Sequence, residues 1–151
     1  MTPFSMFRRL VIAGVLVTVV FASVQTKAQE IPDAMLQEAL VKEALITFND
    51  ANMTGNYEVM RLRTAKPFQD KFTPEDLLGM FKSFGDQDVD IATVAGMDIV
   101  EDAAAKVENG VLTLSGHFET SPLRVNYVLD FMVEENDWAL IGIDVSAKPV
   151  E

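Results

Sequence analysis

The second half of the chain constrains the fold more than any other part. Over residues 107–145, three runs rich in β-branched and aromatic residues alternate with two short turn signals. Such residues favour the pleated surface of a strand, whereas Asn, Gly, Pro and Asp favour the turns between strands. We therefore predict a curved antiparallel sheet, onto which the first half of the chain folds.

The turn signals also predict how the strands pair. The Asn-Gly turn at 109–110 suits a type I′ hairpin because both residues tolerate positive φ, and it places Val107 opposite Leu112. Across the next turn, pairing Glu119 with Arg124 leaves one face of the sheet apolar and the other polar. A slip by one residue would mix the two faces, so the pattern itself supports this register.

The last turn, at 134–137, predicts the pairing of the final strand. It places Trp138 opposite Val133, and the same register brings Tyr127 opposite Asp144 on the apolar face. The second face then gathers an apolar patch beside its polar edge. Because a large exposed apolar patch usually marks an interface, we expect a homodimer through it, unless the C-terminal tail or the region of Asp98 covers it. The residues of this predicted dimer face are Val128, Met132, Ile141, Ile143 and Val145.

The first half of the chain is predicted to be helical. After Pro32 and Asp33, apolar residues recur every three or four positions from Leu36 to Ala51, as on the buried face of a helix. The segment 73–76 (Thr-Pro-Glu-Asp) begins another helix, because Thr caps it and the acids suit its dipole. The acidic run at 86–90 lacks the Gly and Glu of a calcium loop, so we interpret it as a turn before a short strand at 89–94.

The N-terminal residues have the pattern of an export signal. Two arginines precede an uncharged apolar run at 10–22, and the Thr-Lys-Ala before position 29 resembles a cleavage site. The run is shorter than the ~20 residues of a membrane span. We predict a signal peptide (1–28), cut after Ala28, and one domain (29–151) that is periplasmic in a Gram-negative bacterium or secreted, with no stable membrane association after cleavage. The alternative is an uncleaved anchor.

Composition excludes several kinds of partner. The formal net charge is -11, and basic residues cluster only at the extreme N-terminus, so we expect no nucleic-acid partner. The chain has no cysteine and one histidine, which removes disulfides, thiolate chemistry and the usual zinc sites. We therefore expect no metal and no cofactor.

Several local motifs carry a resemblance to a known superfamily. They are Phe48-Asn49-Asp50-Ala51 with Gly55-Asn56-Tyr57, Phe72-Thr73-Pro74-Glu75, and Trp138-Ala139-Leu140-Ile141-Gly142. With three helices before a bent antiparallel sheet, the chain resembles the nuclear transport factor 2-like superfamily, most of all its small exported members of uncharacterised function. The resemblance implies an α+β cone, with N-terminal helices packed on a strongly curved sheet. Members include isomerase-like and dehydratase-like enzymes, ligand binders and dimerisation modules, so the fold does not decide the function.

The resemblance also implies a pocket between the concave sheet face and the helices. An isomerase of this superfamily uses an acidic base and a Tyr/Asp pair that stabilises an enolate. Tyr127 and Asp144 are the residues of this type on the predicted inner face, and no second acid completes the set. The alternative is that Tyr127 belongs to the core and Asp144 reaches solvent. The pocket residues predicted in this way are Gly116, Phe118, Tyr127, Gly142 and Asp144.

A second candidate pair is His117 with Asp102, which the first hairpin places opposite one another on the polar face. A carboxylate that orients an imidazole is the arrangement of a general base. The alternative is a surface ion pair of little energetic weight. From all these features we expect an exported, non-enzymatic domain that dimerises and binds a small apolar ligand between helices and sheet. The alternatives are an enzyme that uses the Tyr127–Asp144 pair, and an interaction module without a pocket.

Overall fold

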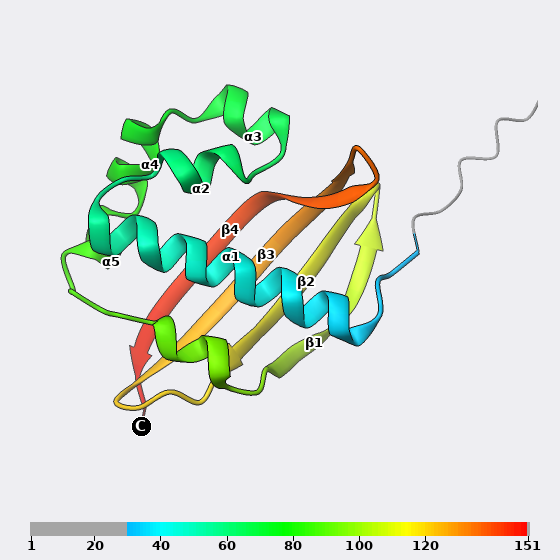
Figure 1. Ribbon diagram of the computed structural model, residues 1–151. Coiled ribbons are helices and arrows are strands. Elements are labelled where there is room, and N and C mark those ends of the chain that lie inside the picture. Colours follow the sequence, from blue (N-terminus) through cyan, green and yellow to red (C-terminus); the bar gives the residue numbers. More distant parts are fainter. Residues whose placement is uncertain (1–29, 151) are drawn as a thin grey trace, which may run out of the picture.

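The computed structural model describes residues 30–150 and shows helices on one face of a four-stranded antiparallel sheet (Figure 1). The predicted α+β class is confirmed. The sheet is open and not strongly curled, so the prediction of a strongly curved cone is wrong. The helices are α1 (Ala34–Thr54), α2 (Glu58–Leu62), α3 (Lys66–Lys71), α4 (Pro74–Met80), α5 (Lys82–Gly85) and the 3-10 helix η1 (Ala92–Gly96). The strands are β1 (Val100–Glu108), β2 (Val111–Phe118), β3 (Leu123–Glu134) and β4 (Asp137–Pro149).

Helix α1 lies across the sheet and forms most of the covering layer (Figure 1). The side chain of Asp33 accepts a hydrogen bond from the backbone N–H of Leu36 at 2.8 Å, and Gly55 ends the helix in the left-handed region at φ 67°. Within the predicted apolar stripe, the residues that are fully enclosed centre on Leu45 and Phe48, with Val41 beside them. Leu36 stays 43% exposed, because the helix begins beyond the densest part of the core.

The short helices α2 to α5 gather around the C-terminal end of α1 (Figure 1). The predicted start of α4 is confirmed: Thr73 and Asp76 form a reciprocal capping box. Hydrogen bonds from Thr73 hold the pKa of the Asp76 carboxyl below its ordinary value. Leu77 and Phe84 are buried, whereas Leu78 and Met80 are about half exposed.

The strand predicted at 89–94 is wrong, because this segment forms a turn followed by η1. The path of this segment is determined by Asn49, which is buried on α1. The Asn49 amide donates to Asp90 at 3.0 Å and its carbonyl oxygen accepts from the backbone N–H of Ile91 at 2.9 Å. Asp90 also accepts from the backbone N–H of Ala92 at 2.8 Å. These bonds satisfy the backbone of the segment without a strand partner.

The two central strands pair as predicted. β2 and β3 keep one register along their shared length, from Phe118 opposite Val125 to Val111 opposite Met132. In the first hairpin, Val107 is opposite Leu112, and the turn at 109–110 has positive φ at both residues, as predicted. Further from this turn, two irregularities in β1 shift the register.

The last hairpin begins in the predicted register and then departs from it. Val133 is opposite Trp138, but an irregularity near Ile141 shifts all later pairs by one residue. As a result Ile143 packs against the core, whereas Asp144 is exposed. The shift is favourable because it turns Ile143, Val145 and Ala147 toward the helices and leaves Asp144 in water.

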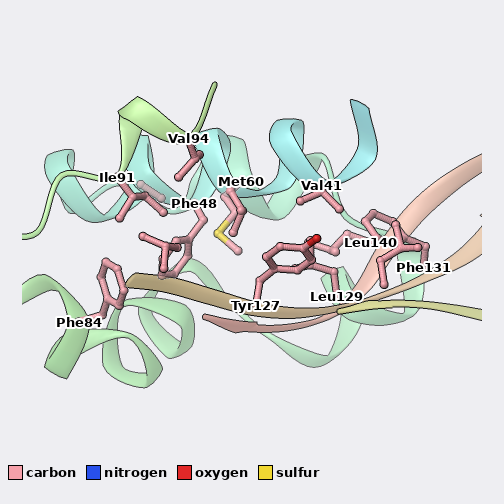
Figure 2. Close-up of a cluster of buried hydrophobic side chains, with 14 of the residues drawn as sticks. Val41, Phe48, Met60, Phe84, Ile91, Val94, Tyr127, Leu129, Phe131 and Leu140 are labelled. Atoms are coloured by element: carbon pink, nitrogen blue, oxygen red, sulfur yellow. The ribbon is translucent and has the colours of Figure 1, made fainter. Parts of the chain in front are cut away.

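The main hydrophobic core lies between α1 and the inner face of the sheet (Figure 2). Phe48 from α1 meets the rings of Phe81 and Phe84 edge-on, with centroids 4.9 and 5.0 Å away. Leu112 and Leu129 supply fully enclosed side chains from the central strands. The helical layer and the sheet therefore stabilise one another through a single core, which holds the buried residues of the inner face in place.

Candidate functional site

A groove of about 240 Å³ opens between the N-terminal half of α1 and the inner face of β1 to β3. Val41 and Leu114 supply apolar walls. We call this feature the Tyr127 groove, because Tyr127 lies at its buried side. Its lining also includes the carboxylates Glu38, Asp98 and Glu101. The groove thus combines apolar surface, three acids and one phenol.

Tyr127 is held in place by the centre of the sheet. It lies on β3, between Gly116 of β2 and Val145 of β4, and is only 4% exposed. Figure 2 shows its ring in the layer between the sheet and α1, with the hydroxyl on the side of Val41. The absence of a side chain at Gly116 makes room for the ring. A Cβ there would lie 2.7 Å from the hydroxyl and 2.5 Å from the carbonyl oxygen of Val100.

The hydroxyl of Tyr127 has no hydrogen-bond partner within residues 30–150. The chain offers an internal comparison, because its other tyrosine is also buried. The hydroxyl of Tyr57 donates to Asn52 at 2.6 Å. Buried tyrosines usually find such a partner, so the unpaired Tyr127 hydroxyl that lines a groove is the unusual one of the two.

The electrostatic surroundings keep Tyr127 protonated. Burial raises its pKa above the ordinary value of 10.0, and the negative charges of Glu101 and Asp102 raise it further. A protonated phenol offers one donor and lone pairs that accept. At neutral pH Tyr127 is therefore a hydrogen-bonding group and not a base.

The structure separates most of the predicted pocket residues. Asp144 lies opposite Val128 on the outer face and is exposed, so the predicted Tyr127–Asp144 pair does not form. Gly142, opposite Asp130, also faces outward. Phe118 is fully buried in the core, with its ring 5.9 Å from that of Tyr127. The shift near Ile141 moves Gly142 and Asp144 to the outer face, and an enzyme based on the Tyr127–Asp144 pair loses its geometric basis.

The same shift divides the predicted dimer face. Val128, 43% exposed, and Met132 remain on the outer face. Ile143 and Val145 instead pack against the core. The predicted apolar patch is therefore not one surface, and the homodimer predicted through it loses its basis.

The three acidic residues that line the groove were not predicted as site residues from the sequence. Glu101 lies on the inner face that alternation from Val107 indicates, and the irregularities in β1 place it opposite Gly116. The sequence carries no signal of these irregularities. Glu38 is different: it precedes Val41 by three positions, and this spacing places both on one side of a helix. That signal was present in the sequence. Asp98 lies just before β1 and has no periodicity to mark it.

The second predicted pair is present on the outer face. His117 Nδ1 is 2.7 Å from Asp102, as predicted, although the residue directly opposite His117 is Val100. His117 Nε2 lies 3.0 Å from Glu119, which Arg124 binds in turn at 2.9 and 3.0 Å.

Both ring nitrogens of His117 are thus engaged by carboxylates. The hydrogen bond from Arg124, followed by that from His117, holds the pKa of Glu119 below its ordinary value. An imidazole with both nitrogens occupied has none free to accept a substrate proton. The arrangement is that of a cross-strand polar network and not of a catalytic base.

Other site types find little support in the described residues. A pocket of about 90 Å³ lies between α1, α2 and β4 and is lined by Leu40, Trp138 and Leu140 among others. Three open hollows of about 630, 470 and 360 Å³ lie beside α1 and α2, beside α4 and α5, and beside the turn between β2 and β3. Within residues 30–150, no group of three or more His, Asp or Glu side chains is placed to hold a metal ion. No helix in this part of the chain is long and apolar enough to cross a membrane.

Comparison of the chain with protein families, curated proteins and solved structures finds no match. The likeness to the nuclear transport factor 2-like superfamily therefore stays a prediction. The proposed function rests on the geometry of the groove.

Proposed function

We propose that this chain is a non-enzymatic binding domain that holds a small molecule in the Tyr127 groove. One observation carries the proposal: a tyrosine that is 96% enclosed keeps a hydroxyl without a protein partner beside a groove of about 240 Å³. The hydroxyl keeps contact with the groove, because the fully buried side-chain polar atom without a partner among residues 30–150 is Arg124 Nε, not this one. A bound molecule can therefore hydrogen-bond to the hydroxyl in place of water.

The surroundings of the groove support binding more than catalysis. Its floor is built from paired strands and its wall from the long helix α1, both of which are tied into the core. Rigid walls reduce the entropy that is lost on binding. Glu38 binds Lys42 at 2.6 Å, and neither Asp98 nor Glu101 hydrogen-bonds to Tyr127. Within the described residues, no acid–base relay therefore runs through the Tyr127 hydroxyl.

Amide NMR with a library of small molecules tests the proposal. Binding in the groove should shift the amides of residues 99–103, 114–116 and 127, and Tyr127→Phe should weaken every such ligand. Tyr57→Phe is the matched control, because its hydroxyl serves only the fold. A library in which ligands shift other regions but never the groove would contradict the proposal.

We also propose that the domain is exported after cleavage behind Ala28. The support is the charged start, the apolar run and the small residues before position 29, which lie outside the described residues. N-terminal sequencing of the protein from the periplasm or medium of its host should begin at Gln29. A chain that keeps Met1 and stays with the membrane fraction would contradict this.

A further inference from the structure

We infer that the Tyr127 groove selects a small organic cation, an amine that carries a short apolar body. The inference rests on the proposed function and names its ligand class. It starts from the charges at the groove. The lining contains three carboxylates, those of Glu38, Asp98 and Glu101, and no lysine or arginine. Lys42, the nearest base on α1, is bound to Glu38.

Two of these acids have no cationic partner among the described residues. Neither Asp98 nor Glu101 takes part in an ion pair, unlike Glu38. The groove is thus a place where negative charge is left without a counter-ion from the chain. A bound cation would supply it.

The second observation is the position of the Tyr127 hydroxyl relative to Glu101. Glu101 is opposite Gly116 in the β1–β2 pair, and the hydroxyl lies over that same glycine. Phenol and carboxylate therefore flank one point of the inner face. An ammonium group has three donors and no acceptor, so it can donate to the phenol oxygen and to the carboxylate together.

The remaining lining fits an apolar body. Val41, Ile99 and Leu114 contribute aliphatic surface next to the polar end, and Ala103 leaves space beside them. A typical small-molecule site has this composition, with apolar walls and a few polar groups that fix orientation. An anionic ligand would instead meet three carboxylates on a chain of net charge -11.

Three probes of matched size test the ligand class: n-hexylamine, n-hexanol and hexanoate. Each is titrated into the protein of residues 29–151 and followed by the amide signals of the groove. We expect hexylamine to bind several-fold more tightly than hexanol, and hexanoate not to bind. Added salt should weaken hexylamine more than hexanol, because screening acts on exposed charges.

Glu101→Gln should lower the affinity for hexylamine about threefold, the scale of one exposed ion pair, and leave hexanol unchanged. Asp144→Asn is the matched control, since it removes one exposed carboxylate from the outer face and should change neither. If hexanol binds the groove as tightly as hexylamine, or Glu101→Gln has no effect, the ligand class is overturned while the proposed function stands. If none of the three probes, nor any library compound, reaches the groove, both are overturned.

Discussion

The middle of the sheet and its two edges differ in regularity. The central strands β2 and β3 pair over eight consecutive positions without a shift, whereas both β1 and β4 change register along their length. A central strand is bonded on both sides, so an extra residue would disturb two ladders. An edge strand disturbs only one, and bulges are accordingly more common there.

In this chain the irregular edges determine what the inner face presents. The shifts in β1 bring Glu101 opposite Gly116, beside the Tyr127 hydroxyl. The shift in β4 takes Asp144 away from Tyr127 and replaces it with Val145. The regular middle therefore supplies the scaffold, and the edges decide which polar groups reach the groove.

The largest expected effect comes from the regular middle. Leu129→Ala removes a fully enclosed side chain from β3, and it should lower the free energy of unfolding by about 4 kcal/mol. The matched variant at the edge, Val145→Ala, should cost about 1 kcal/mol, because this side chain is only partly buried. Urea denaturation measures both. Equal losses would mean that the edge is packed as tightly as the middle.

Gly116→Ala tests how closely β1 and the ring of Tyr127 approach the backbone of β2. Its Cβ would meet the Val100 carbonyl oxygen at 2.5 Å and the Tyr127 hydroxyl at 2.7 Å, so the neighbouring strand and the ring must move. We expect a loss of about 3 kcal/mol, typical of overpacking. Gly79→Ala is the control, because nothing lies within 4 Å of its Cβ. A neutral Gly116→Ala would contradict the position of Tyr127.

The register of β4 is tested by charge placement. Ile143→Asp should lower the free energy of unfolding by about 2 kcal/mol, because it places a carboxylate against the core. Val128→Asp, on the outer face, should change it little. If Ile143→Asp changed the free energy of unfolding little and Val128→Asp lowered it, β4 would instead pair in the predicted register without a shift.

The dependence of stability on alkaline pH tests the burial of the two tyrosines, Tyr57 and Tyr127. Burial raises the pKa of Tyr57 to about 12 and raises that of Tyr127 as well. The folded state therefore binds both phenol protons more tightly than the unfolded chain. The stabilisation that these two groups contribute is complete below pH 10 and is lost as pH rises above it. Tyr127→Phe should reduce this fall, as followed by urea midpoints. Tyrosinate absorbance that appears in the folded protein with a midpoint of 10.0 would show that neither ring is buried.

The smallest effect concerns the polar network on the outer face. Arg124→Gln removes the main cause of the lowered pKa of Glu119, and carboxyl NMR should show this pKa rising toward its ordinary 4.5. A lowered folded pKa stabilises the protein above the ordinary value and ceases to do so as pH falls through the folded one. The difference in stability between wild type and Arg124→Gln should thus shrink below pH 4.5. A Glu119 pKa that does not move would contradict the contact.

Much of the fold was predictable from local signals. The central register followed from alternation, the first hairpin from its Asn-Gly turn, and the start of α4 from Thr73 and Asp76. The strand predicted at 89–94 failed because alternation there competes with a tertiary contact. Asn49, more than forty positions away, binds this segment in a turn.

The candidate site was predictable only in part. Tyr127 was identified because the resemblance implies a Tyr/Asp pair on the inner face, and the His117–Asp102 contact was predicted correctly. The partner proposed for Tyr127 was wrong because one extra residue in β4 exchanges the faces of everything after it. A bulge depends on which side chains the core can accept. Because this depends on tertiary packing, no turn residue in the sequence predicts the bulge.

The most direct test is the native mass spectrum of the protein purified from its own host, taken for wild type, Tyr127→Phe and Tyr57→Phe. Wild type and Tyr57→Phe should carry the same bound small molecule, because the Tyr57 hydroxyl is satisfied by Asn52. Tyr127→Phe should have lost most of it while remaining folded. Retention of that molecule by Tyr127→Phe at the level of wild type would contradict a site built on the Tyr127 hydroxyl.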